Sequence, residues 1–142
     1  QRCLYYLDKE IKMNTSKLVK NEKIAQIEID KYRPIYYAAV SGDYSPLHID
    51  PELARSFGLK KNILHGLCTI ALVVDAVGIK IGNPAAVKKF KCRFVSPVFP
   101  GDTVNISIEE CDDSILILKV INQDNNKILD KVSVYISDMD LD

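Results

Sequence analysis

The sequence predicts an α+β domain in which a curved antiparallel sheet of about five strands wraps around one long buried helix. The first observation is the segment ILHGLCTIALVVDAVG, residues 63–78, which is apolar on almost every side when it is read as a helix. A helix of this kind has no face suited to solvent and is expected to be buried. The second observation is that the chain after Pro84 changes to strand-like runs, which supply the surrounding sheet.

The chain is predicted to begin its folded part with a strand followed by a helix. Residues 24–29, IAQIEI, alternate apolar and polar side chains, as a half-buried strand does. Asp30 is a candidate cap for a helix over 31–42, in which Pro34 is tolerated because it falls in the first turn. Gly42 is expected to end this helix.

A second, shorter helix is predicted over residues 50–58. Asp50 is its expected cap, Pro51 occupies its first position and Gly58 ends it. A basic loop then leads into the long apolar segment.

The last part of the chain is predicted to form the antiparallel sheet. Turn residues separate four strand-like runs, which are 86–99, 103–111, 114–122 and 127–137. In the first run Lys89, Lys91 and Arg93 alternate with apolar residues. One face of this strand should therefore pack on the core, and the other should be solvent-exposed and basic. This order of elements is typical of the hot-dog fold.

Composition excludes several classes of protein. The 142 residues are 47% hydrophobic and 27% charged, with a formal net charge of zero, so the basic excess of a nucleic-acid binder is missing. No apolar run reaches the ~18 residues of a membrane span. The cysteines are scattered without a zinc spacing, which favours a reducing compartment and leads to a prediction of the cytoplasm. We interpret residues 1–23 as an N-terminal extension or leader segment and 24–142 as the domain.

The stretch SGDYSPLH, residues 41–48, places a carboxylate and an imidazole close together. Asp43 and His48 are the candidates for a general acid–base pair, because one group is ionised at neutral pH and the other titrates near it. Pro46 forces the residue before it into an extended conformation, so both side chains can turn toward one point. The structural alternatives are a turn-forming aspartate and a histidine satisfied within the core.

A second candidate element lies at the start of the buried helix, where His65 precedes Gly66. The first amides of a helix are unpaired, and a glycine lets a ligand oxygen approach them closely. A thioester carbonyl that gains enolate charge needs such a donor. The alternative for Gly66 is close packing of the helix start, and we expect no chemical role for the His65 side chain.

Residues 41–71, SGDYSPLHIDPELARSFGLKKNILHGLCTIA, resemble the signature of the MaoC-like hydratases. This family comprises the R-specific enoyl-CoA hydratases and the hydratase domains of peroxisomal multifunctional enzymes. Its pattern is a Gly-Asp-x-Asn-Pro-Leu/Ile-His run, then Asp-Pro-x-x-Ala, then His-Gly at a helix start. RFVSPVFPGDT, residues 93–103, is also similar to the family's strand and turn. Gly42 and Pro46 support the motif, whereas Ser45 stands where the family usually has Asn.

The resemblance implies a reaction, which we state as an expectation. Asp43 and His48 would activate the water that adds to a trans-2-enoyl thioester and gives the (3R)-hydroxyacyl product, with dehydration as the reverse reaction. Gly66 would supply the backbone donor to the thioester oxygen. No metal or redox cofactor is expected, since CoA or an acyl-carrier-protein arm arrives with the substrate.

The resemblance also suggests how substrate and partner are held. Lys89, Lys91 and Arg93 are candidates for binding the phosphates of the carrier, although a solvated charged face is the simpler interpretation. Tyr44 is a candidate for lining an acyl tunnel. A single unit with a complete motif should form a homodimer, or a larger oligomer built from it, that binds no nucleic acid and no membrane.

Two other functions stay open at this point. A hot-dog acyl-CoA thioesterase would share the fold but needs a carboxylate on or beside the central helix, where Asp75 is the only acid. A non-catalytic acyl-CoA-binding module would need neither Asp43 nor His48, and both are present.

Overall fold

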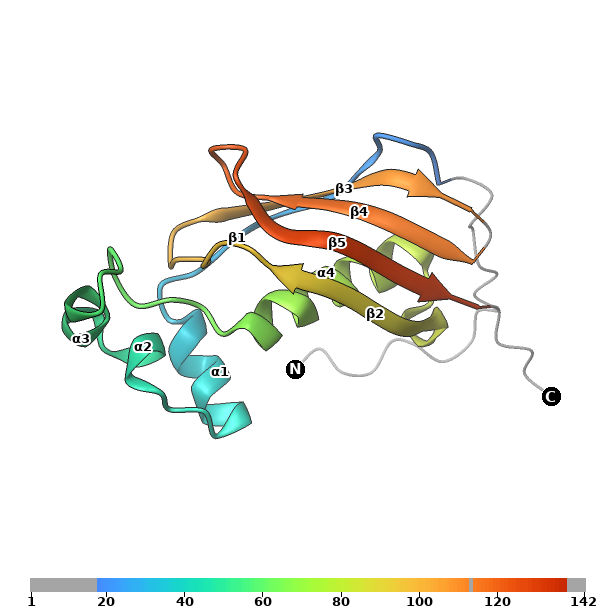
Figure 1. Cartoon of the computed structure of the whole chain (residues 1–142). Helices are drawn as coiled ribbons and strands as arrows, with labels where there is room; N and C mark the ends of the chain where they lie inside the picture. The colour runs from blue at the N-terminus through green and yellow to red at the C-terminus, as the bar shows by residue number, and fades with distance from the viewer. Residues whose placement is uncertain (1–17, 113, 138–142) are drawn as a thin grey trace.

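The computed structural model describes residues 18–112 and 114–137. Residues 1–17, the greater part of the segment that we interpret as an extension or leader, lie outside the described residues. Five strands form one sheet in the order β1-β3-β4-β5-β2, and every neighbouring pair is antiparallel. They are β1 (Lys23–Glu28), β2 (Val87–Phe94), β3 (Thr103–Cys111), β4 (Ile115–Ile121) and β5 (Lys127–Ile136). The predicted sheet of about five antiparallel strands is therefore confirmed (Figure 1).

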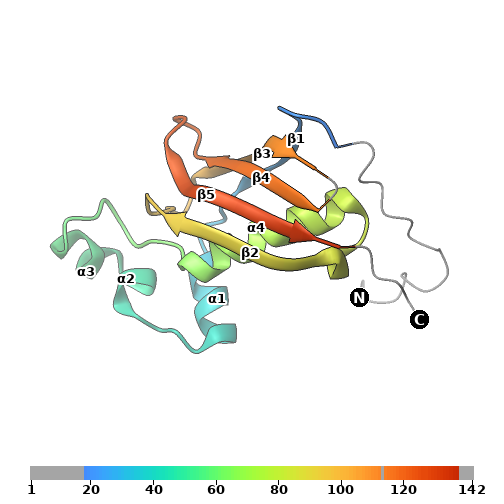
Figure 2. The ribbon, with the colours of Figure 1, turned by 45° about the vertical axis from the view of Figure 1, so that its right-hand side comes forward.

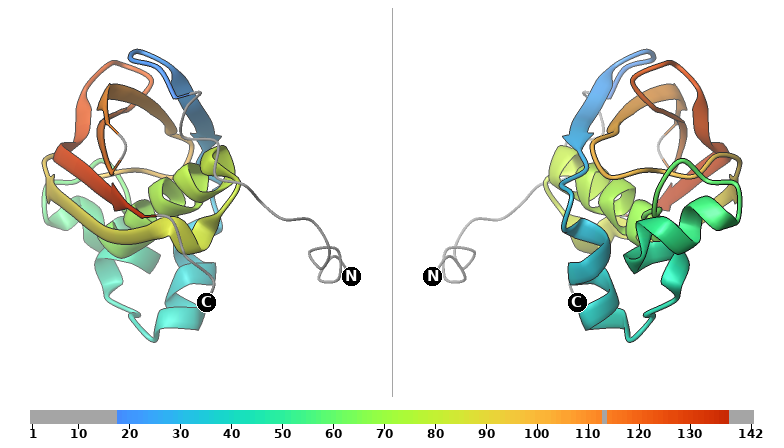
Figure 3. Two further views of the ribbon diagram at one scale, coloured as in Figure 1. Left: turned by 90° about the vertical axis from the view of Figure 1, so that its right-hand side faces the viewer. Right: turned by 90° about the vertical axis from the view of Figure 1, so that its left-hand side faces the viewer.

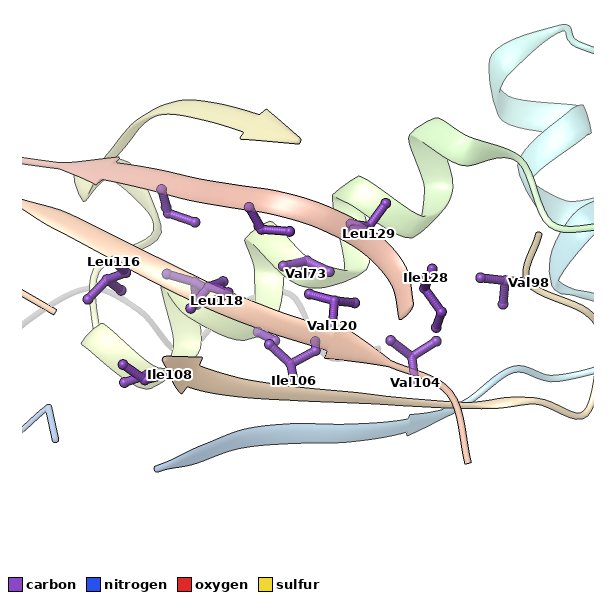
Figure 4. Packing of buried hydrophobic residues seen from close by; sticks show 14 of the residues in the cluster. Val73, Val98, Val104, Ile106, Ile108, Leu116, Leu118, Val120, Ile128 and Leu129 are labelled. Atoms are coloured by element: carbon purple, nitrogen blue, oxygen red, sulfur yellow. The ribbon is translucent and has the colours of Figure 1, made fainter. Parts of the chain in front are cut away.

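The long helix α4 (Gly66–Ile81) lies along the concave face of the sheet, which curves around it in Figures 2 and 3. Val73 on this helix has no exposed surface, and side chains of β3, β4 and β5 point toward it (Figure 4). Alternate residues of β3 are buried, which is the period expected of a strand with one face on a core. The core of the molecule thus lies between α4 and the inner face of the sheet.

One face of α4 does not meet the sheet. The exposed residues of this face are Leu67, at 67%, Ala71, Asp75 and Ile79, at 70%. The prediction of a helix buried on all sides is wrong for the single chain, because the sheet curves around only part of the helix. Three of these four residues are apolar, and a largely apolar helix face in this position is a surface that a partner can cover.

Three short helices lie together at the end of the molecule where α4 begins (Figure 1). They are α1 (Arg33–Ser41), α2 (Pro46–Ile49) and α3 (Pro51–Ser56). A 3₁₀ turn, η2 (Pro84–Ala86), follows α4 at its other end. No helix among the described residues is long and apolar enough to cross a membrane.

Only some of the helix caps predicted from the sequence are present in the structure. Asp50 caps α3 as predicted, since its carboxylate accepts hydrogen bonds from the N–H groups of Glu52 and Leu53. Asp30 does not cap α1, because its carboxylate accepts from the N–H of Tyr32, just before the helix begins. Gly42 ends α1 in the left-handed conformation, at φ 76°, as predicted.

Candidate active site

Asp43 and His48 are brought together by the turn between α1 and α2. Gly42 reverses the chain at the end of α1, and Ser45 before Pro46 is extended, at φ −51° and ψ 129°. Pro46 then begins α2, a four-residue helix that places His48 near its end. This helix was not predicted, because one turn of helix is too short to show a periodic pattern.

The imidazole of His48 is oriented by the chain that leads into α4. Its Nδ1 lies 2.9 Å from the carbonyl oxygen of Ile63. A carbonyl oxygen only accepts hydrogen bonds, so Nδ1 carries a hydrogen, and in the neutral imidazole Nε2 keeps its lone pair. Asn62 donates from its side-chain amide to the carbonyl of His48, at 2.8 Å. The connection between α3 and α4 therefore holds both the ring and the backbone of His48.

The carboxylate of Asp43 faces the free nitrogen of this ring. Oδ2 of Asp43 lies 3.9 Å from Nε2 of His48, which is too long for a direct hydrogen bond. Both atoms are acceptors, so a water molecule about 2.8 Å from each can donate one hydrogen to each of them. The His48 side chain is 14% exposed and that of Asp43 is 55% exposed, so the pair opens to the surface on the aspartate side.

Ser45 fixes Asp43 through the backbone. The other carboxylate oxygen of Asp43, Oδ1, accepts from the N–H of Ser45 at 3.1 Å, and the N–H of Asp43 donates to Oγ of Ser41 at 3.2 Å. A backbone N–H does not depend on the side chain, so Ser in place of Asn keeps this bond. Ser45 thus contributes to the orientation of Asp43 through its backbone N–H.

His65 is the residue at this site that sequence reasoning missed. Its side chain is buried, its Nε2 lies 2.9 Å from the carbonyl oxygen of Asp43, and its ring stacks on that of His48 with centroids 3.7 Å apart. The ring of Tyr37, on α1, also packs against the His65 ring, with centroids 4.8 Å apart. The signal in the sequence was the His-Gly pair of the motif, in which we assigned a role to Gly66 and none to the His65 side chain.

Asp43, His48 and His65 each offer an atom within 4.8 Å of the others, a spacing that could suit a metal ion. The two imidazole planes are stacked, only 25° apart. The lone pair of an imidazole lies in the plane of its ring, so two stacked rings do not direct their lone pairs at one ion. The geometry therefore suits an acid–base pair with a supporting ring better than a metal site.

Gly66 is the first residue of α4, as predicted, and its neighbour across the fold is Phe94 at the end of β2. A Cβ atom at position 66 would lie 2.9 Å from the Phe94 ring, so the absence of a side chain lets this ring come close. Phe94 itself is 53% exposed. Sequence reasoning assigned Phe94 no role, because strand alternation indicated only a core residue.

The predicted phosphate-binding residues of β2 contact side chains of the neighbouring strand β5. The ammonium groups of Lys89 and Lys91 lie 5.5 Å and 5.3 Å from the ring centroid of Tyr135 on β5. Arg93 donates to Asp130 at 2.7 Å. Hydrogen bonds from Lys127 and then Arg93 hold the pKa of the Asp130 carboxyl below its ordinary value. The structure thus supports a solvated charged face for these three residues more than a binding site.

Two further candidate residues occupy exposed positions. Tyr44, beside Asp43, is 56% exposed and remains available to a substrate. Asp75 is exposed on α4 and lies nine positions after Gly66, which corresponds to about 13 Å along the helix axis. It therefore does not share a site with the start of the helix.

Comparison with known proteins settles the family. The profile of the family described as "MaoC like domain" matches residues 11–132, which is most of the chain. The chain belongs to this MaoC-like family. Its region 41–71, which carries the motif, holds Asp43, His48 and Gly66 in the arrangement described above.

Relatives of known name share this domain. The chain is 50% identical over 68 residues to "Enoyl-CoA hydratase 2, peroxisomal" of Arabidopsis thaliana, covering 46% of this chain and 22% of that protein. It is 36% identical over 114 residues to "Peroxisomal hydratase-dehydrogenase-epimerase" of Saccharomyces cerevisiae, covering 80% of this chain and 12% of that protein. The chain therefore spans less than a quarter of the length of these relatives.

Solved structures confirm the hot-dog fold. A MaoC-like dehydratase from Phytophthora capsici superposes with a TM-score of 0.77 at 28% identity, covering 89% of this chain and 43% of that one. The R-hydratase PhaJ1 from Pseudomonas aeruginosa superposes with a TM-score of 0.70 at 26% identity, covering 87% of this chain and 84% of that one. The single unit seen here thus has neighbours both of its own size and of about twice its length.

Proposed function

We propose that this MaoC-like domain is a hydro-lyase that adds water to a trans-2-enoyl thioester and gives a (3R)-hydroxyacyl thioester, or catalyses the reverse dehydration. The observation that carries the proposal is the 3.9 Å separation of two hydrogen-bond acceptors, Oδ2 of Asp43 and Nε2 of His48. Relatives named as enoyl-CoA hydratases and as a 3-hydroxyacyl-thioester dehydratase support the reaction class.

The geometry suggests how the reaction proceeds. A water that donates to both acceptors turns its lone pairs away from them and toward the β-carbon of the alkene. One member of the pair accepts a proton as the oxygen adds, and the pair returns a proton to the α-carbon, so the change is neutral as a whole. The N-terminal amides of α4, beginning at Gly66, would stabilise negative charge on the thioester oxygen. The chemistry needs no metal or redox group, and CoA or an acyl carrier protein would deliver the acyl chain.

The proposal includes a second copy of this chain as the partner. The exposed, largely apolar face of α4, with Leu67 and Ile79 on either side of Asp75, supports a homodimer, because a second unit can cover it. The two edge strands β1 and β2 are further surfaces that a second unit can cover. Replacing Ile79 with Asp should shift the chain to monomer in sedimentation velocity, whereas Val40→Asp, on an exposed position of α1, should not.

The predicted cytoplasmic location stays a prediction, and several relatives are named as peroxisomal.

The test follows the conjugated enoyl-thioester absorbance with crotonyl-CoA and with a longer enoyl-CoA, and determines the stereochemistry of the product with an (R)-specific dehydrogenase. Asp43→Asn and His48→Ala should each lower kcat by about a hundredfold or more, the scale expected for a general acid or base. Asp124→Asn, in an exposed turn, is the matched control and should retain full activity. Near-normal turnover in either site variant would contradict the assignment of the pair.

The thioesterase alternative is less well supported, since Asp75 is exposed and far along α4 from Gly66. It predicts release of a free thiol, which a colorimetric reagent detects in the same reaction mixtures. A thiol signal without loss of the enoyl absorbance would replace the hydratase proposal. Neither signal, together with tight binding of acyl-CoA, would favour a binding module.

A further inference from the structure

His65 touches both members of the proposed pair. Its Nε2 donates to the carbonyl oxygen of Asp43 across a 2.9 Å contact, and this carbonyl belongs to the peptide group that joins Asp43 to Tyr44. The His65 ring also stacks on the ring of His48, with centroids 3.7 Å apart. The local turn and the bonds to Asn62 and Ile63 bring Asp43 and His48 together, and the His65 ring adds a direct link between the two.

The burial of His65 indicates a specific function for its hydrogen bond. His65 is 2% exposed, and its Nδ1 has no hydrogen-bond partner in the part of the chain that the structure describes. A core position selected only for packing would favour an apolar ring, because a buried polar atom without a partner is unfavourable. The polar ring at this position is therefore explained by the bond from Nε2 to Asp43.

The two histidines have opposite tautomers. His48 carries its hydrogen on Nδ1, which donates to Ile63, whereas His65 carries its hydrogen on Nε2, which donates to Asp43. Each ring is thus fixed by a backbone carbonyl from the segment that holds the other ring. Ile63 lies in the same segment as His65, and Asp43 lies in the same segment as His48. Each segment therefore holds the histidine ring of the other.

We infer that His65 is a positioning residue that holds Asp43 and His48 at the separation needed to bind the reacting water. It does so by donating to the Asp43 carbonyl and stacking on the His48 ring. This inference rests on the proposed function for its effect on turnover, but the contact itself can be measured without any activity.

Two variants separate the hydrogen bond from the ring. His65→Phe keeps an aromatic ring for the stack and loses the donor. His65→Gln loses the ring, but its amide nitrogen lies the same number of bonds from Cα as Nε2 of histidine and can donate to the same carbonyl. We expect His65→Phe to lower kcat by about 10- to 100-fold, the scale of a small misplacement of catalytic groups, while KM changes by less than about threefold. We expect His65→Gln to recover most of this loss.

Nuclear magnetic resonance measures the contact independently of activity. The wild-type chain has two histidines, so its ring-nitrogen spectrum should show one Nδ1–H ring and one Nε2–H ring, and His65→Phe leaves His48 alone for assignment. Loss of the donor in His65→Phe should move the carbonyl ¹³C signal of Asp43 upfield, and His65→Gln should restore it.

The outcomes distinguish this inference from the proposed function. An unchanged kcat in folded His65→Phe, an unchanged Asp43 carbonyl signal, or a wild-type His65 with its hydrogen on Nδ1 would each overturn the positioning role. Equal losses of kcat in the Phe and Gln variants would overturn the role of the hydrogen bond. If the wild type turns over no enoyl thioester, the proposed function fails, and the carbonyl signal still decides whether His65 holds Asp43.

Discussion

Replacement of Val73 by Ala tests whether the sheet packs against α4 as described. Val73 has no exposed surface and faces side chains of the sheet (Figure 4). The change removes two methyl groups, which costs about 1.6 kcal/mol at ~0.8 kcal/mol for each buried group. A cavity of about 50 Å³ adds roughly 1 kcal/mol at ~24 cal/mol per Å³. The free energy of unfolding should therefore fall by about 2–3 kcal/mol, which lowers Tm by roughly 10 °C in a domain of this size.

Val40→Ala is the matched control, because it makes the same chemical change on another helix. Val40 of α1 is 88% exposed, so its replacement should change the free energy of unfolding by less than about 0.5 kcal/mol. Urea unfolding followed by circular dichroism measures both variants against the wild type. Equal destabilisation by the two changes, or a Val73→Ala effect below about 0.5 kcal/mol, would refute the packing of the sheet over this face of α4.

Three further predictions concern glycine packing, pH and a helix cap. A Cβ on Gly78 would lie 2.9 Å from the backbone of Pro84, whereas one on Gly66 would meet only the movable ring of Phe94, so Gly78→Ala should lower Tm more than Gly66→Ala. Hydrogen bonds from Lys80 and then the Val19 backbone lower the pKa of Glu22 below its ordinary 4.5, so this group stabilises the fold above that pH. The stabilisation is lost as the pH falls through the lowered pKa, and the urea midpoints of wild type and Glu22→Gln should converge in acid. Asp50→Ala removes the cap of α3 and should cost about 1 kcal/mol in urea unfolding, with equal stability counting against the cap.

The strands and the long helix could be predicted because their periodic patterns report burial directly. The run predicted over 103–111 matches β3 (Thr103–Cys111), in which inward and outward side chains alternate. The helix α4 begins at Gly66, the residue that was expected to stand at the start of the buried helix. What the pattern could not show was the open face of α4, since an apolar residue looks the same whether its own chain or a partner covers it.

The candidate pair could be predicted because the motif is contiguous. Asp43 and His48 are five residues apart, and local turn chemistry at Gly42 and Pro46 brings them together. The roles of His65 and Phe94 could not be read from the sequence, because they depend on contacts across the fold. His65 reaches Asp43 over 22 positions of chain, and Phe94 meets Gly66 from the end of a strand.

The openness of the site leads to a last prediction. Asp43 is 55% exposed, and Tyr44 beside it is 56% exposed, so the carboxylate side of the pair faces solvent in the single chain. Stabilisation of developing charge is much stronger when bulk water is excluded, so the site should be completed by something that covers this side. A second unit bound to the nearby exposed face of α4, which begins at Leu67, is the candidate cover.

Activity should therefore depend on assembly. On dilution, the turnover number per chain should fall in parallel with the fraction of dimer measured by sedimentation velocity, and Ile79→Asp should reach the same low turnover at every concentration. Ile79 lies more than three helical turns from Gly66, about 20 Å along α4, so this change acts on assembly without touching the pair. A constant turnover number in samples that are demonstrably monomeric would show that substrate alone closes the site, and that one chain is the complete catalyst.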